Sequence, residues 1–278
     1  MFYLIFLAVA ADISAVIISK WTLAKQKLTC NYFNTLIFWS LAGFSALSLY
    51  WFGYLDAAEA TGLKFLLLFG AMVTLAVWWN WLNTQALWRE ELDHYELIVM
   101  TAPLFTVVAS ALFLPEEREV KHLLAAIAVS VVLILTHIKK QHFNFSQYDK
   151  WLLVAVILIA LEAVVVKSLL AVWSPAALYF SRALLVAITF TAIKPVKFSN
   201  ISKKQWGGVL GVGLFGALFK IIQYVGYDKL GVVSTTMILV LSPFLVLILD
   251  KIVLREKLQI KYIFGMLAIG AIIVFTFV

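Results

Sequence analysis

Apolar runs of about 20 residues follow one another along almost the whole chain, separated by short polar connections. A helix needs about 20 such residues to cross a bilayer, whereas the strands of membrane barrels alternate apolar and polar residues. Hydrophobic residues make up 64% of the 278, well above the share in soluble domains. The sequence therefore predicts an all-α membrane protein with ten transmembrane helices. The predicted spans are 2–20, 34–53, 65–87, 95–114, 121–138, 151–172, 176–193, 206–227, 232–250 and 260–277.

The basic residues are divided unevenly between the two sides of this bundle. Fourteen Lys and Arg residues lie in the connections between spans 1–2, 3–4, 5–6, 7–8 and 9–10, and four lie on the side of the termini. Since cytoplasmic loops carry the excess of Lys and Arg, both termini are predicted to lie outside, and we expect a bacterial cytoplasmic (inner) membrane. Topology then explains the net charge of +7, and no nucleic-acid partner is expected.

The two halves of the chain repeat each other's rare residues. Three pairs match at an offset of 147 residues: Lys20 with Lys167, Tyr32 with Tyr179, and Phe33 with Phe180. Four pairs match at an offset of 140 residues: Asn80 with Lys220, Asn83 with Gln223, Pro103 with Pro243, and Glu116 with Glu256. We predict two five-helix repeats, residues 1–142 and 143–278, in one membrane domain. Because five is odd, the second repeat is inverted, as in many secondary transporters that bind substrate near the midplane.

Several of these features together resemble a known family. Five plus five spans, a proline in the fourth span of each half and a glutamate at the following turn ("LPEER" and "LREKL") are similar to the drug/metabolite transporter superfamily, in particular its EamA-like branch. The resemblance covers nearly the whole chain and depends more on architecture than on any single motif. It implies transport of small metabolites, amino acids, nucleotide sugars or drugs. Familiar members have both termini in the cytoplasm, which differs from the orientation that the charge count predicts here.

Pro103 and Pro243 lie inside the predicted fourth and ninth spans. A proline cannot donate to the carbonyl four residues earlier, so kinks are expected that free the carbonyls of Val99 and Leu239. We assign a gating role to both prolines. Whether each kink is simply packed or its carbonyl contacts substrate stays open at this point.

Charged side chains inside the spans are expected to be functional, because each costs about 2.5–3.5 kcal/mol at a helix centre. Asp12, Glu162 and Lys220 lie too deep to reach an interface, and we predict that they face a central cavity. Arg182 either forms an internal ion pair with Glu162 or Asp12, or holds substrate. The remaining two charges, Lys20 and Lys167, lie near span ends, where such side chains either extend to the interface or face the cavity.

Helical periodicity adds amides and aromatic rings to the candidate site. One face of the eighth span and the matching face of the third carry small and polar residues at spacings of three and four: Gly213, Gly216, Lys220, Gln223 and Tyr227, and Ala76, Asn80, Asn83 and Leu87. The amides either line a cavity or bond neighbouring helices together. In "VWWNWLN", at least one of Trp78, Trp79 and Trp81 should face the interior, where a ring can stack on a substrate or hold a cation.

The mixed charges predict a secondary active exporter of a small polar or zwitterionic metabolite, such as an amino acid, working by alternating access. The alternative is a proton-coupled exporter of lipophilic cations, in which Asp12 resembles the embedded acid of the small multidrug resistance relatives. A fixed ammonium at Lys220 repels cations and so separates the two. The sequence contains neither HExxH nor a glycine-rich phosphate loop, so we expect no enzyme, cofactor or metal. The predicted substrate-binding residues are Asp12, Trp78, Trp79, Asn80, Asn83, Glu162, Arg182, Lys220, Gln223 and Tyr227.

Overall fold

The computed structural model of the chain describes residues 2–25, 28–55, 60–90, 92–137, 146–196, 201–242, 245–246 and 260–277. Within these ranges the chain forms helices, joined by turns, and a single isolated bridge between Leu55 and Trp173. The helices are α1 (Phe2–Lys25), α2 (Cys30–Phe52), α4 (Leu63–Arg89), α5 (Leu92–Val99), α6 (Ala102–Phe113), the short 3₁₀ helix η1 (Pro115–Glu117), α7 (Val120–His137), α8 (Gln147–Leu169), α9 (Pro175–Ile193), α10 (Lys203–Lys229), α11 (Val232–Leu239) and α13 (Ile260–Phe277).

Six of the described helices are long and apolar enough to cross a membrane, namely α1, α2, α4, α8, α9 and α10. Shorter apolar helices occur over Ala102–Phe113, Val120–Val132 and Leu267–Thr276. The all-helical membrane fold is therefore the one expected from the sequence. The number of ten spans and the inverted order of the halves stay predictions.

The predicted fourth span is two helices. α5 ends at Val99 and α6 begins three residues later, with Pro103 in its first turn. The carbonyl of Thr101 accepts from the backbone N–H of Leu104 at 3.1 Å, so a new helix starts here where the sequence predicts a kink. Proline is favourable in a first turn, because its missing N–H would have no partner there. Pro243 lies outside the described residues.

Helix lengths recur between the two halves. α4 and α10 each have 27 residues, α5 and α11 each have 8, and α7 and α13 each have 18. In all three pairs the bounds of the second helix are those of the first shifted by 140 positions. The offset of 140 positions at which rare residues match in the sequence thus also separates the first and last residues of these helix pairs.

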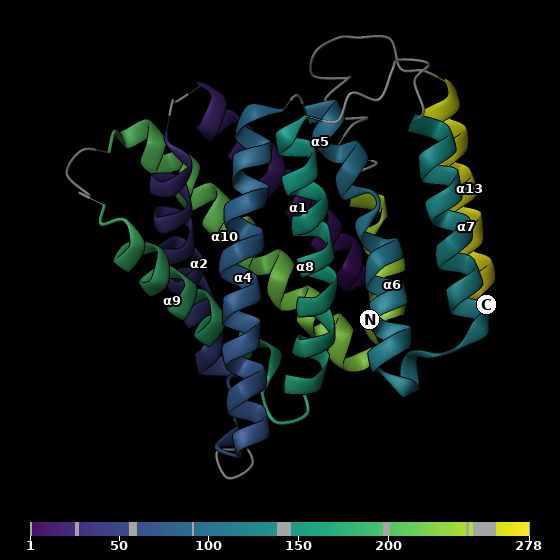
Figure 1. Cartoon of the computed structure of the whole chain (residues 1–278), viewed down its shortest axis with the longest axis horizontal. Helices are drawn as coiled ribbons and strands as arrows, with labels where there is room; N and C mark the ends of the chain where they lie inside the picture. Colours follow the sequence, from purple (N-terminus) through teal and green to yellow (C-terminus); the bar gives the residue numbers. More distant parts are fainter. Residues whose placement is uncertain are drawn as a thin grey trace.

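The long helices pack in pairs drawn from different halves of the chain. α4 packs along α8, α1 along α10 and α2 along α9, while α7 and α13 lie side by side at one edge (Figure 1). This packing is not the same in the two halves: α10 packs extensively against α2, whereas α4 packs sparingly against α9.

Glycines account for the close approach of α10. A Cβ at Gly208 would lie 2.2 Å from Oγ1 of Thr22 on α1, and a Cβ at Gly213 would lie 1.9 Å from Oγ of Ser40 on α2. No other residue leaves enough room for these helices at this distance. The α4 positions 140 residues earlier hold Leu68 and Val73, whose bulk does not permit an equally close contact.

The start of α11 is completed by a carboxylate from the first half of the chain. The backbone N–H groups of Val232 and Val233 donate to Glu117 Oε1 at 2.7 Å and Oε2 at 3.2 Å. The preceding Gly231 has a φ of 88°, and a Cβ there would lie 2.5 Å from Glu117 Oε1. A negative charge is favourable at a helix N-terminus. The neighbouring Glu116, by contrast, has an exposed side chain.

We expect Glu117→Gln to lower the free energy of unfolding by about 1–3 kcal/mol, because an amide loses the charge and turns one donor toward backbone donors. Glu116→Gln is the matched control, since the Glu116 side chain is exposed. Thermal unfolding of both variants in the same detergent measures the difference. Equal melting temperatures would contradict the capping role.

Candidate functional site

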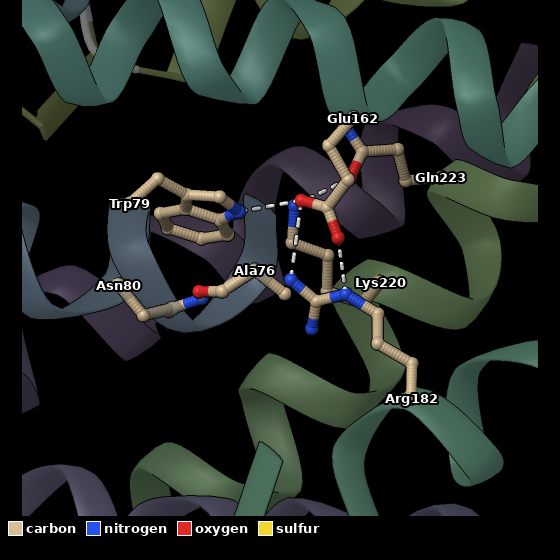
Figure 2. A network of polar contacts seen from close by, with 7 residues as sticks. All are labelled: Ala76, Trp79, Asn80, Glu162, Arg182, Lys220 and Gln223. Atoms are coloured by element: carbon tan, nitrogen blue, oxygen red, sulfur yellow. Dashed lines mark hydrogen bonds and ion pairs between the residues drawn. The ribbon is translucent and has the colours of Figure 1, made fainter. Parts of the chain in front are cut away.

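Glu162, in the second half of α8, is bonded by side chains from two other helices (Figure 2). Trp79 Nε1 of α4 donates to Glu162 Oε2 at 2.5 Å. Arg182 of α9 donates through Nε to Oε1 and through Nη2 to Oε2 at 3.2 Å. The exposed fraction is 5% for Glu162 and 1% for Arg182. Of the two arrangements open for Arg182, the structure therefore has the internal ion pair, in the two-pronged geometry that suits a guanidinium.

Lys220 of α10 lies beside this ion pair without joining it. Its Nζ is 5.6 Å from the ring centroid of Trp79 and 5.0 Å from that of Phe219, and it donates to Gln223 Oε1 at 2.8 Å. Gln223 Nε2 in turn donates to the hydroxyl of Tyr227 at 3.0 Å. Among the residues that the structure describes, no carboxylate lies within 4.0 Å of the Lys220 ammonium. Its contacts are one amide oxygen and aromatic rings.

Asp12 of α1 is held by a residue from the far end of the chain. Its Oδ2 accepts from Ser242 Oγ at 2.5 Å, a contact between residues 230 positions apart. Asp12 also interacts electrostatically with Lys220. The two halves therefore both contribute charged groups to the same region of the protein.

The amides predicted on α4 and α10 bond in different ways. Asn83 Oδ1 accepts from the Tyr95 hydroxyl at 2.9 Å. Gln223, which matches Asn83 at an offset of 140, also bonds a tyrosine, but it donates to the Tyr227 hydroxyl. Asn80 Nδ2 instead donates to a backbone carbonyl of its own helix, that of Ala76, at 2.7 Å (Figure 2). Asn83 and Gln223 thus extend the polar cluster through tyrosines, and Asn80 does not bond a neighbouring helix through this contact.

Some of the residues predicted from the sequence are not brought to this cluster. Trp78 is 57% exposed and meets Trp81 edge to face, with ring centroids 6.4 Å apart. Gly213 and Gly216 face Ser40 and Leu41 of α2 and serve helix packing. Lys20 and Lys167 bind backbone carbonyls at helix ends. Asn80 bonds within its own helix. We define the polar cluster by the other predicted residues: Asp12, Trp79, Asn83, Glu162, Arg182, Lys220, Gln223 and Tyr227.

Two buried residues of α5 near the cluster are not among the residues predicted from the sequence. Tyr95 is 5% exposed and Glu96 is 1% exposed, and both Glu96 and Asp12 act electrostatically on the Tyr95 hydroxyl. At the predicted beginning of the fourth span, a carboxylate is ordinary and draws no attention. Their burial follows from the break before Pro103, because that break makes α5 a separate short helix packed against α8.

Two tyrosines also surround the ion pair. Tyr179 and Tyr224 meet edge to face with ring centroids 5.7 Å apart, and Arg182 lies 5.9 Å from the Tyr179 ring centroid. The site therefore presents cationic, anionic and aromatic groups to one small region. In the described part of the chain, no three His, Cys, Asp or Glu side chains converge as a metal site would require.

Residues 147–278 match the model of the EamA-like transporter family. A solved crystal structure of a protein resembles the chain with a TM-score of 0.67, covering 96% of this chain and 94% of its own, at 13% sequence identity. At that identity the likeness shows the fold alone. No curated protein matches the chain.

Proposed function

Residues 147–278 form an EamA-like transporter domain of the drug/metabolite transporter superfamily, and from that premise we propose that this membrane transporter is a secondary active exporter of small zwitterionic metabolites, such as amino acids. Transport would proceed by alternating access between two inverted repeats, residues 1–142 and 143–278. We further propose a bacterial inner membrane, with both termini outside, from the distribution of Lys and Arg. The observation that supports this substrate class is that the Lys220 ammonium binds an amide oxygen and no carboxylate of the described residues.

The Lys220 ammonium is the cation of the cluster that an incoming anion can engage. Arg182 already holds both oxygens of Glu162, whereas Lys220 binds an amide oxygen of Gln223. A cation inside the membrane is costly without a partner, so a substrate carboxylate that binds Lys220 gains a charge-assisted hydrogen bond. Asp12, which interacts electrostatically with Lys220, supplies the negative charge that a substrate ammonium needs.

The alternative, a proton-coupled exporter of lipophilic cations, requires a free carboxylate and a free aromatic face. Glu162 accepts hydrogen bonds from Trp79 and Arg182. The Trp79 ring already has two cations near it, Arg182 at 5.7 Å and Lys220 at 5.6 Å from its centroid. These contacts favour a zwitterion over a cation. Proton exchange at Asp12 or Glu162 belongs to the alternative.

We expect amino acids to raise the melting temperature of the purified protein, and Lys220→Gln to abolish that rise. A ligand present at 100 times its Kd stabilises the native state by about 2.7 kcal/mol. Lys203→Gln at the exposed start of α10 is the matched control and should respond like the wild type. The measurement is a thermal-shift screen with amino acids, quaternary ammonium compounds and organic phosphates. Stabilisation by quaternary ammonium compounds alone would contradict the proposal and support the alternative.

A further inference from the structure

Four of the helices that carry the polar cluster, α1, α4, α8 and α10, form two close contacts and two loose ones. α1 packs mainly against α10, and α4 mainly against α8. In contrast, α1 and α4 pack sparingly against each other, as do α8 and α10. We call the α1–α4 contact the first seam and the α8–α10 contact the second seam.

A lysine crosses the first seam at its end. Lys20, in the last turns of α1, donates through Nζ to the carbonyl of Leu87 at 2.6 Å and to the carbonyl of Glu90. These two residues lie in the last turn of α4 and at its C-cap. The last carbonyls of a helix lack partners within it and carry partial negative charge, so an ammonium is a favourable partner. Lys20 therefore joins two helices that otherwise pack sparingly against each other.

A second lysine does the same at the second seam. Lys167, in the last turn of α8, donates through Nζ to the carbonyl of Tyr227 at 2.8 Å and to that of Asp228 at 3.4 Å. Both belong to the last turn of α10. Lys20 and Lys167 match at the sequence offset of 147, and Leu87 and Tyr227 match at 140. The same contact thus occurs once in each half.

The two lysine contacts lie at opposite ends of the helices. Ser146, the N-cap of α8, donates to Glu90 Oε1 at 2.5 Å, so α8 begins beside the end of α4 where Lys20 binds. Lys167 is 21 residues further along this helix, which places it about 30 Å away at 1.5 Å per residue. Lys20 therefore holds the first seam near one end of the bundle, and Lys167 holds the second seam near the opposite end.

We propose that Lys20 and Lys167 are a pair of gate contacts, each of which must release its helix end before the protein opens on that side. This inference rests on the alternating access proposed above and goes beyond it by assigning the two gates. An ammonium bound to backbone carbonyls exchanges them for water when the helix end moves away, so the contact can be made and broken in each cycle. With both lysines bound, the conformation described here has both seams held.

The chain contains a natural reporter for the first seam. Cys30 is the single cysteine, is 3% exposed, and donates through Sγ to the carbonyl of Thr84 on α4 at 3.7 Å, one turn before Leu87. Movement of the end of α4 away from α1 would expose this thiol. We expect Lys20→Gln to increase the rate of Cys30 alkylation by N-ethylmaleimide about tenfold, because a neutral amide binds the helix-end carbonyls more weakly than an ammonium does. Lys167→Gln should leave this rate unchanged or lower it.

A reporter for the second seam follows from the repeat. Ala177 of α9 lies 147 positions after Cys30 and is 9% exposed. In a Cys30→Ala, Ala177→Cys background, Lys167→Gln should increase the alkylation rate and Lys20→Gln should not. The two reporters therefore predict opposite patterns for the same two variants.

The alkylation rates of the two thiols in the two variants together test the gate assignment. Increases at both thiols from either variant would indicate general loosening, and no increase at either thiol would indicate permanent helix caps; both results would overturn the gate assignment. Lys20→Arg and Lys167→Arg keep a charged donor and should retain the wild-type alkylation rates. Because alkylation is measured without substrate, its result is independent of the thermal-shift test, and the substrate class and the gate assignment can each fail while the other holds.

Discussion

Replacement of Arg182 by methionine is expected to lower the free energy of unfolding by about 3–5 kcal/mol, because removing one partner of a buried ion pair leaves an uncompensated charge. Arg182 is 1% exposed and Glu162 is 5% exposed, so water does not replace the guanidinium. Methionine has similar length and fills much of the volume, which keeps the loss electrostatic. Unfolding in detergent, followed by heat or by denaturant, measures the change.

A second substitution distinguishes the unpaired charge from simple loss of packing. Glu162→Gln in the Arg182→Met background removes the negative charge but keeps an oxygen for the Trp79 Nε1 hydrogen bond. We expect this double variant to recover more than half of the lost stability. If it is as unstable as Arg182→Met alone, the buried charge is not the cause.

Gly213→Ala is expected to cost about 1–3 kcal/mol, the range for overfilling a packed interface. The added Cβ would lie 1.9 Å from Ser40 Oγ, 2.6 Å from Ser40 Cβ and 3.1 Å from the backbone carbon of Ser40. Rotation of the Ser40 side chain relieves only the first of these contacts. α10 must therefore move away from α2, which weakens the packing between these two helices.

Two further variants test this reasoning. Gly70→Ala in α4 is the matched control, because a Cβ there meets nothing within 4 Å, and alanine is the better helix former. Ser40→Gly combined with Gly213→Ala moves the small residue from one helix to the other and should recover part of the stability. A Gly213→Ala protein that melts at the same temperature as Gly70→Ala would contradict the close approach of α10 to α2. The melting temperatures of all three variants are compared in one detergent.

Charges inside apolar spans are rare and costly, so the sequence singles out the charged residues of the cluster. Glu162, Lys220 and Arg182 stand out for that reason, and the helices that carry them begin and end close to the predicted spans. The partner of Arg182 was not decided by the sequence, since it depends on how α8 and α9 are turned toward each other. Membership of the transporter superfamily, suspected from architecture, is confirmed for residues 147–278.

Other features depend on packing that local sequence does not encode. Trp78 and Trp79 are neighbours in an apolar helix, yet one is 57% exposed and the other 8%. Glu117 rather than Glu116 caps α11, because the partner helix comes from the other half of the chain. Lys20 and Lys167 were expected either to reach the interface or to face the cavity, and helix-end carbonyls in the same half of the chain offered a third partner.

The glycine face of α10 makes the two sides of the bundle unequal. α10 has glycines where it packs against α1 and α2, whereas the positions 140 residues earlier in α4 hold Leu68 and Val73. In a protein assembled from two copies of residues 143–278, the glycines of α10 would be present in both copies. Both sides of the bundle would then pack equally closely.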